Sequence, residues 1–426
     1  MRRLITVVSV VMFVCCGFTA NQGLAQKAAT LPALTKEQWR EDLRYFAAEL
    51  PKRHKNLYHA TTREQFERAV AELDAAIPSL QAHQIIVRMQ QLAATVGDGH
   101  TGVHLPPYFK RYPLALYWFG NELRVIAAAE EYQKALGARV VKIGAMGIDE
   151  VQTRVRSCLP SAENENEWYV LGTSPAFIVM AEVLHALGVV SELERAAFTF
   201  ADEQGKQFTL EISPVEVPIV GGVPALRLLP AAKVQPLYRQ KPGERFWFTY
   251  LPDWQTVYVS FRGLKSGYQA LAEDGRKLFQ FIDSNPTKRL VIDLRQNGGG
   301  DFFVGRKHLI QPLKKYPALN QRGSLFVIIG RATFSAAMVN AIDFRKETNA
   351  TLVGEPIGER PNSYSENDEM TLPNSRLVVS YSTRYYKFLD EDLPAVLPDK
   401  RIDPNWADFQ AGRDPVMEWI LSHNSQ

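Results

Sequence analysis

The sequence predicts a mixed α/β protein, and three observations support this fold class. Residues 36–95 carry apolar side chains at the spacing of amphipathic helices. Short apolar runs at 114–118 and 123–127 flank a Gly-Asn turn, which is typical of paired strands. From residue 246 onwards, strand-like and helix-like runs alternate. This alternation favours parallel strands with helices packed on their faces.

Composition limits the classes of protein that this chain can represent. The 426 residues are 46% apolar and 22% charged, which is enough to bury large cores in about two to three domains. The net charge of +3 shows no strongly basic surface of the kind that nucleic-acid-binding proteins carry. We therefore expect no nucleic-acid partner.

The N-terminus has the pattern of a secretory signal peptide over residues 1–25. Arg2 and Arg3 precede an apolar stretch, and small residues follow it at the expected cleavage site. We expect export to the periplasm or the extracellular space and no stable membrane span after cleavage, although a retained anchor is the alternative. Only Cys158 would remain in the mature chain, so neither an internal disulfide nor a cysteine metal cluster is expected.

The order of these patterns predicts the domain organisation. A helical domain ends in a glycine-rich loop around Asp98 and His100, and Pro51 and Pro78 are predicted to separate its helices. A middle region follows, with a hairpin formed by strands at 198–200 and 208–212. The predicted segments are 26–106 (helical domain), 107–213 (α+β middle region), 214–245 (proline-rich linker) and 246–426 (last domain).

Two apolar runs in the last domain end in loops suited to acyl transfer. Gly298, Gly299 and Gly300 would allow backbone amides to approach an oxyanion closely. Ser335 follows the second run and opens a helical pattern, which places its hydroxyl and the amide of Ala336 at a helix N-terminus. Both loops would lie beyond the carboxyl ends of parallel strands, where ligands bind. A helix-capping serine and a merely flexible loop are the alternatives.

Five ordered motifs carry a resemblance to a known family: GDGHT (97–101), DLRQNGGG (293–300), TFSAA (333–337), GEPIGERPNSY (354–364) and AVLPD (395–399). With these, the chain resembles the C-terminal processing (tail-specific) serine peptidases, particularly the branch similar to the tricorn core protease and interphotoreceptor retinoid-binding protein. The resemblance implies a helical N-terminal domain, a PDZ-like middle region and a ClpP/crotonase-like catalytic domain. Residues 136–151 are similar to half of a PDZ element, although ordinary strand-turn-helix packing explains them equally well.

The resemblance also implies roles for individual residues. Ser335 matches the nucleophile, and Gly298 or Gly299 with Ala336 matches the oxyanion donors. Serine-lysine members of the family carry a lysine in the loop that here contains Glu359 and Arg360, and arginine cannot act as a base at neutral pH.

His100 matches the histidine of the tricorn-like branch and is therefore the candidate base. Lys387 is the alternative base. A purely structural role for His100, without proton transfer, is the other alternative.

A histidine base needs a carboxylate that orients it and stabilises its cation. Asp392 matches the family's acid, and Glu391, Glu366 and Asp98 are alternatives. Each of them could equally be a solvated surface carboxylate.

These inferences together predict an exported serine peptidase that acts on protein tails or peptides. No metal or cofactor is expected, because the histidines and carboxylates lack ligand spacing. The alternative is a non-catalytic protein that binds peptides or apolar ligands on the same fold.

Overall fold

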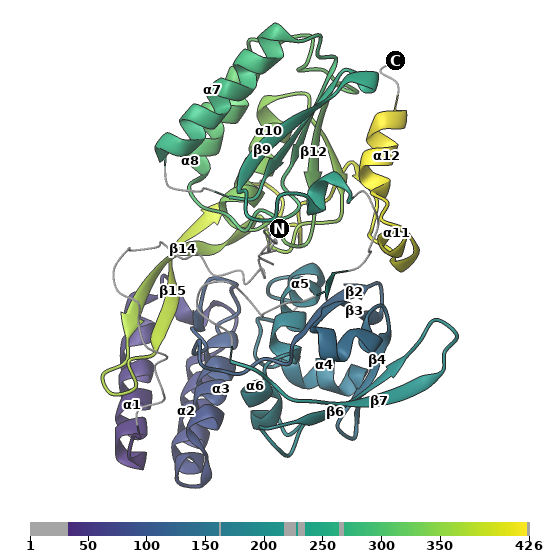
Figure 1. Ribbon diagram of the computed structural model, residues 1–426. Coiled ribbons are helices and arrows are strands. Elements are labelled where there is room, and N and C mark those ends of the chain that lie inside the picture. The colour runs from purple at the N-terminus through teal and green to yellow at the C-terminus, as the bar shows by residue number, and fades with distance from the viewer. Residues whose placement is uncertain (1–32, 162, 217–226, 229–234, 264–267, 424–426) are drawn as a thin grey trace, which may run out of the picture. The chain divides into compact units, whose positions relative to one another are not determined.

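The computed structural model describes residues 33–161, 163–216, 227–228, 235–263 and 268–423, and it divides into two compact units. Unit 1 contains the described residues up to 228 together with Ser363–Tyr386, and unit 2 contains those at 235–362 and from 387 onwards (Figure 1). The predicted signal peptide, 1–25, and much of the predicted linker, 214–245, lie outside the described residues. Within the described ranges, none of the helices combines the length and apolar character that a membrane crossing requires.

Unit 1 begins with three helices, as the apolar spacing predicts. Thr35 and Thr62 each form a capping box with a glutamine three residues later, which satisfies amides at the helix start. Apolar residues three or four positions apart, such as Leu43 and Phe46, are fully buried in one core. The helices are α1 (Lys36–Arg53), α2 (Arg63–Ala76) and α3 (Ala82–Ala94).

The two predicted proline breaks have different outcomes. Pro78 lies in a short 3₁₀ turn, Ile77–Ser79, between α2 and α3, so this break is confirmed. The break predicted at Pro51 is wrong, because α1 continues through it to Arg53. Proline in the last turn of a helix removes little of the intrahelical hydrogen bonding, so the helix tolerates it there.

An antiparallel sheet with three helices follows in unit 1. Its main strand order is β2-β3-β4-β6-β7, with β5 paired to β4 and β8 to β3. The predicted hairpin is confirmed, since Phe200 on β6 lies opposite Phe208 on β7. The elements are β2 (Leu114–Phe119), β3 (Glu122–Ala128), β4 (Arg139–Ile143), β5 (Met146–Gly147), α4 (Ile148–Arg156), α5 (Glu167–Ile178), α6 (Ala181–Ala186), β6 (Ala196–Ala201), β7 (Gln207–Ile212) and β8 (Arg227–Leu228).

A three-stranded sheet completes unit 1, in the order β1 (Gly102–Val103), β15 (Val378–Lys387) and β14 (Asn362–Thr371). Figure 1 shows β14 and β15 beside α1, and their apolar side chains share its core. The buried carboxylate of Asp42 accepts the backbone N–H groups of Asn374 and Ser375, both at 2.8 Å. The strand pair is therefore held on the N-terminal helices, although the sequence placed it within 246–426. The predicted domain boundaries remain predictions.

Unit 2 is built on a six-stranded sheet in the order β16-β13-β12-β11-β10-β9. The predicted parallel pairing is found from β16 to β10, whereas β9 runs antiparallel at the edge. Every residue of β10, β11 and β12 is buried, as expected for strands covered on both faces. The strands are β9 (Phe246–Leu251), β10 (Thr256–Phe261), β11 (Arg289–Asp293), β12 (Leu325–Ile329), β13 (Thr351–Gly354) and β16 (Lys400–Arg401).

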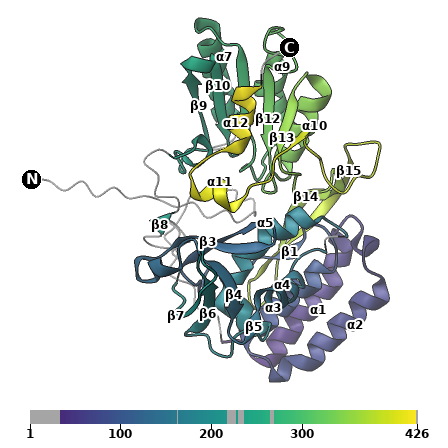
Figure 2. The same cartoon turned by 90° about the vertical axis from the view of Figure 1, so that its right-hand side faces the viewer.

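Helices cover both faces of this sheet. Figures 1 and 2 show α7 and α12 on opposite faces. Alternate residues of the strands separate accordingly, since Val257 packs in the larger core and Tyr258 in the core that includes α12. The helices are α7 (Tyr268–Ser284), α8 (Phe302–Gly305), a π-helical turn (Arg306–Ile310), α9 (Gln311–Leu313), α10 (Ala336–Glu347), α11 (Trp406–Gln410) and α12 (Pro415–Ser422).

Further short 3₁₀ helices span Leu57–His59, Glu130–Ala135, Leu237–Arg239 and Pro252–Trp254. The predicted mixed α/β fold class with an N-terminal helical region is thus confirmed.

Candidate active site

Ser335 lies at a sharp turn between β12 and α10 in unit 2. It is the N-cap residue of α10 and has φ +53° and ψ −124°, a strained conformation for a residue with a side chain. The buried hydroxyl of Thr333 holds the turn, because it donates to the carbonyl of Leu294 at 2.9 Å and accepts the N–H of Gly330 at 3.0 Å. A strained strand-to-helix turn is the local geometry that exposes a nucleophilic serine.

The glycine loop packs directly against this turn. Gly299 has φ +115°, and a Cβ atom added there would lie 2.9 Å from the Cβ of Ser335. The N–H of Phe334 also donates to the carbonyl of Asn297 at 3.0 Å. However, the N–H of Gly299 already donates to Asn297 Oδ1 at 2.9 Å. Gly298 and Ala336 therefore remain the better candidates for oxyanion donors.

Glu359 provides a contact that the sequence did not predict. Its side chain is fully buried, and its carboxylate accepts the backbone N–H of Ser335. The loop in which serine-lysine peptidases carry a lysine thus supplies, in this chain, a carboxylate that binds the backbone N–H of Ser335. No local sequence pattern relates Ser335 to Glu359, so only the structure could show the contact.

The remaining candidates of unit 2 lie at its surface. Asp392, the predicted acid, has a side chain that is 71% exposed, and its Oδ2 lies 3.7 Å from Nη1 of Arg360. The neighbouring Glu391 is exposed too, and its carbonyl accepts a hydrogen bond from Asn362 at 3.0 Å. Lys387, the lysine alternative, is exposed at the end of β15.

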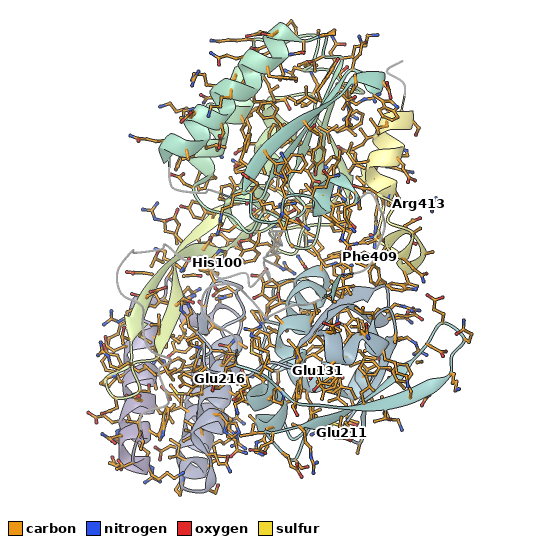
Figure 3. All side chains as sticks on the ribbon, in the orientation of Figure 1. His100, Glu131, Glu211, Glu216, Phe409 and Arg413 are labelled. Atoms are coloured by element: carbon orange, nitrogen blue, oxygen red, sulfur yellow. The ribbon has the colours of Figure 1, made fainter. Side chains whose placement is uncertain are left out.

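His100 lies in unit 1, in the loop between α3 and β1 (Figure 3). Its Nε2 atom is 3.3 Å from the hydroxyl oxygen of Ser365 on β14. Burial lowers the pKa of His100, and the negative charges of Asp98 and Glu366 oppose this shift without reversing it. The imidazole is therefore neutral near pH 7, which is the form that can accept a proton.

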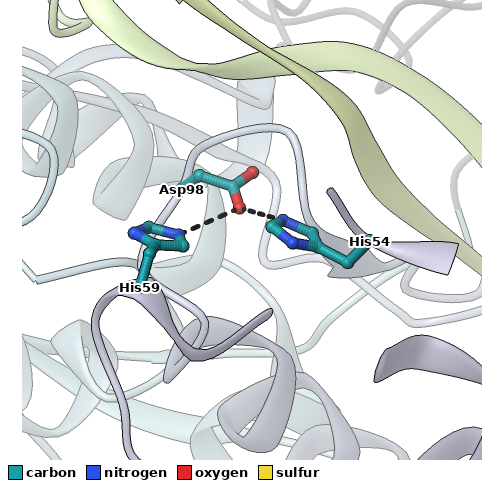
Figure 4. Close-up of side chains that lie close together, drawn as sticks. All are labelled: His54, His59 and Asp98. Carbon is teal, nitrogen blue, oxygen red and sulfur yellow. Dashed lines mark hydrogen bonds and ion pairs between the residues drawn. The ribbon is translucent and has the colours of Figure 1, made fainter. Parts of the chain in front are cut away.

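Asp98 is the best-buried of the alternative acids. It is 2% exposed, and its Oδ2 atom lies 2.9 Å from Nε2 of His54 and 3.7 Å from Nε2 of His59 (Figure 4). Burial alone would raise the pKa of Asp98, but hydrogen bonds, first that from His54, hold this pKa well below its usual range. Asp98 is therefore an anion at neutral pH. Glu366 is more exposed, and its carboxylate accepts the hydroxyl of Tyr386 at 2.7 Å.

The cluster of His54, His59 and Asp98 was missed by the sequence analysis. Its ligand-type atoms lie within 4.8 Å of one another, whereas His54 and Asp98 are 44 residues apart in the chain. The two histidines of the segment HKNLYH were the only available signal. Histidine and aspartate are residue types that also bind metal ions, and the sequence analysis expected no such arrangement of ligands.

The fold and the serine turn together define a mixed α/β protein that presents a strained serine at a strand-to-helix junction. No family model matches the sequence, and no curated protein matches it either. Among solved structures, mature CPAF complexed with lactacystin matches at 10% identity and a TM-score of 0.59, covering 90% of this chain and 97% of that one. Mature CPAF alone matches at 10% identity and a TM-score of 0.58, over 90% and 96% of the two chains.

These matches show that the chain shares the fold of CPAF. The photosystem II D1 C-terminal processing protease is also found, at 14% identity, with a TM-score of 0.39 and coverage of 87% of this chain and 93% of that one. The branch suggested by the GDGHT motif stays a prediction.

Proposed function

We propose that this protein is a serine peptidase in which Ser335 is the nucleophile. The observation that carries the proposal is the strained conformation of Ser335 directly against Gly299, at the N-terminus of α10. Backbone strain costs folding free energy, and a serine that only caps a helix does not require it. A fixed, strained serine beside a glycine loop instead suits attack on a carbonyl.

The proposed reaction uses residues of this chain alone. The Ser335 oxygen forms a bond to the peptide carbonyl carbon while His100 takes the hydroxyl proton. The amides of Gly298 and Ala336 donate to the oxyanion, and the positive end of α10 favours its charge. The protonated His100 then gives its proton to the leaving amine, and water hydrolyses the acyl ester by the same steps.

His100 is a better base than Lys387 under this proposal. Burial lowers the pKa of His100, so the imidazole is unprotonated at neutral pH. Lys387 is exposed, whereas lysines that act as general bases are usually buried. Asp98 and Glu366 are the carboxylates whose charges stabilise the imidazolium in unit 1, and Asp392 is the acid that the resemblance implies.

Protein tails or peptides are the proposed substrates, and the pattern at residues 1–25 supports the proposal that the protein is exported. Cell fractionation with N-terminal sequencing of the mature chain tests this second point. A chain that keeps residues 1–25 in the cytoplasm would contradict it.

Covalent labelling tests the nucleophile. The purified mature protein is treated with a fluorophosphonate probe, and the adduct is located by peptide mapping. Labelling should occur at Ser335, disappear in Ser335→Ala, and persist in Ser284→Ala, which removes an exposed hydroxyl at the end of α7. A folded protein that takes up no probe would instead favour the non-catalytic binding protein.

A further inference from the structure

The carboxylate of Asp98 is saturated with hydrogen bonds. Its Oδ2 atom accepts Nε2–H of His54 at 2.9 Å and the hydroxyl of Thr101 at 3.0 Å. Its Oδ1 atom accepts the hydroxyl of Ser382 at 2.7 Å and the backbone N–H of His100 at 3.1 Å. An ionised carboxylate offers about four lone-pair sites, so each site already has a donor.

The tautomer of His54 follows from its own contacts. Its side chain is fully buried, and Nδ1 lies 3.0 Å from the backbone N–H of Asn56, which can only donate. Nδ1 is therefore an unprotonated acceptor. The proton of the neutral ring must sit on Nε2, from which it is donated to Asp98.

These hydrogen bonds argue against a metal ion at the cluster. A metal-bound histidine presents an unprotonated nitrogen to the metal and usually donates its other N–H to an acceptor. In His54 that second nitrogen instead faces the donor N–H of Asn56. The lone pairs of Asp98 are also occupied, and Nε2 of His59, at 3.7 Å, is beyond hydrogen-bond length from them.

The saturated carboxylate holds the loop that carries His100. Besides the His100 N–H, the turn is closed by the N–H of Thr101, which donates to the carbonyl of Asp98 at 3.4 Å. The preceding Gly97 has φ +93°, and a Cβ atom there would lie 2.6 Å from that of Ala60. His54 is the C-cap residue of α1, so its bond to Asp98 ties a helix end to this loop.

We propose that His54 and Asp98 are positioning residues that hold His100 for proton transfer. The inference rests on the proposed function, in which His100 is the base. Removing the donor of His54 would leave a buried anion one hydrogen bond short, and the loop would shift to find another. A displacement of about 1 Å at a reacting group can cost on the order of 100-fold in rate.

Two substitutions at one position separate the hydrogen bond from the volume of the side chain. His54→Gln keeps an N–H donor close to the place of Nε2, whereas His54→Leu keeps only the bulk. His83→Leu is the matched control, because His83 is another buried histidine of unit 1, on α3, and contacts His185 rather than Asp98. The readout is fluorophosphonate labelling of Ser335, resolved into a probe-binding constant and a maximal rate.

We expect His54→Leu to lower the maximal labelling rate about 10- to 100-fold with an unchanged probe-binding constant. His54→Gln should stay within about threefold of the parent protein, and His83→Leu should match it. Labelling of His54→Leu at the parent rate would overturn the inference. Absence of labelling in the parent protein would refute the proposed function instead, before any His54 variant is compared.

A second measurement does not depend on turnover. The ring signals of His100 in an NMR spectrum of the histidine-labelled protein should change in His54→Leu and stay unchanged in His83→Leu. Unchanged His100 signals in His54→Leu would overturn the inference. So would a zinc titration that shifts the ring signals of His54 and His59 together at one equivalent, because the cluster would then be a metal site.

Discussion

Replacing Gly299 with alanine tests the contact between the glycine loop and the serine turn. The added Cβ atom would lie 2.9 Å from the Cβ of Ser335, 3.2 Å from the carbonyl oxygen of Phe334 and 3.3 Å from the backbone nitrogen of Ala336. Two of these neighbours are backbone atoms and cannot swing aside. The substitution must therefore displace the turn that carries the nucleophile.

The size of the effect follows from these distances. Carbon atoms pack at roughly 3.5–4.0 Å, so Ser335 would have to move by about 0.5–1 Å. A misplacement of this size corresponds to a rate loss on the order of 100-fold. The positive φ of +115° adds backbone strain of about 1–3 kcal/mol, which lowers the free energy of unfolding.

The assay is the rate of fluorophosphonate labelling, with urea unfolding measured on the same samples. Gly205→Ala is the control, because Gly205 has φ +79° and a Cβ there would meet no atom within 4 Å. It should lose stability through backbone strain and keep the labelling rate. If Gly299→Ala labelled as fast as the parent protein, the glycine loop would have no part in shaping the serine site.

Three further predictions concern pH and buried polar contacts. Burial and the neighbouring His185 lower the pKa of His83 to about 4, below the ordinary 6.5 of the unfolded chain. Between these two pKa values the unfolded chain binds more protons than the folded protein, so the free energy of unfolding should fall as the pH drops from about 6.5 to about 4. The fall should be at most about 3 kcal/mol, and less where water screens the ring. Urea unfolding across this range should show a smaller fall in His83→Leu. The hydroxyl of Tyr258 donates to the buried carboxylate of Asp293 at 2.7 Å. Tyr258→Phe should therefore lower the free energy of unfolding by about 1–3 kcal/mol in the same assay. An unchanged free energy of unfolding would mean that this hydrogen bond does not stabilise the fold. Burial lowers the pKa of His100, so the rate of Ser335 labelling should rise with pH and reach half its maximum at a pH below 6.5. A half-maximal rate reached only above pH 6.5 would exclude this imidazole as the base.

Much of the fold was predictable because its signals are local. The buried runs of β10, β11 and β12 are continuous apolar segments, and their alternation with helical patterns specifies parallel pairing. The rule does not apply to the edge strand β9, which pairs antiparallel with the next strand, β10. Two consecutive strands can pair in this way through a short connection.

Contacts between distant segments were not predictable in the same way. The strands β14 and β15 lie on the N-terminal helices because their apolar faces complete that core, and Asp42 caps the turn between them. One alternating strand pattern is compatible with many partner surfaces, so the sequence alone could not choose this one.

The sequence by itself determined the helical N-terminal region, the parallel sheet and the place of Ser335 between a strand and a helix, because each depends on the spacing of neighbouring side chains. Only the tertiary structure decided which groups meet these residues. The close packing of Gly299, the carboxylate of Glu359 on the Ser335 amide and the bond between His54 and Asp98 join segments that are far apart in the chain. Such contacts depend on how packed helices and strands bring distant loops together. The spacing of neighbouring side chains does not determine that arrangement.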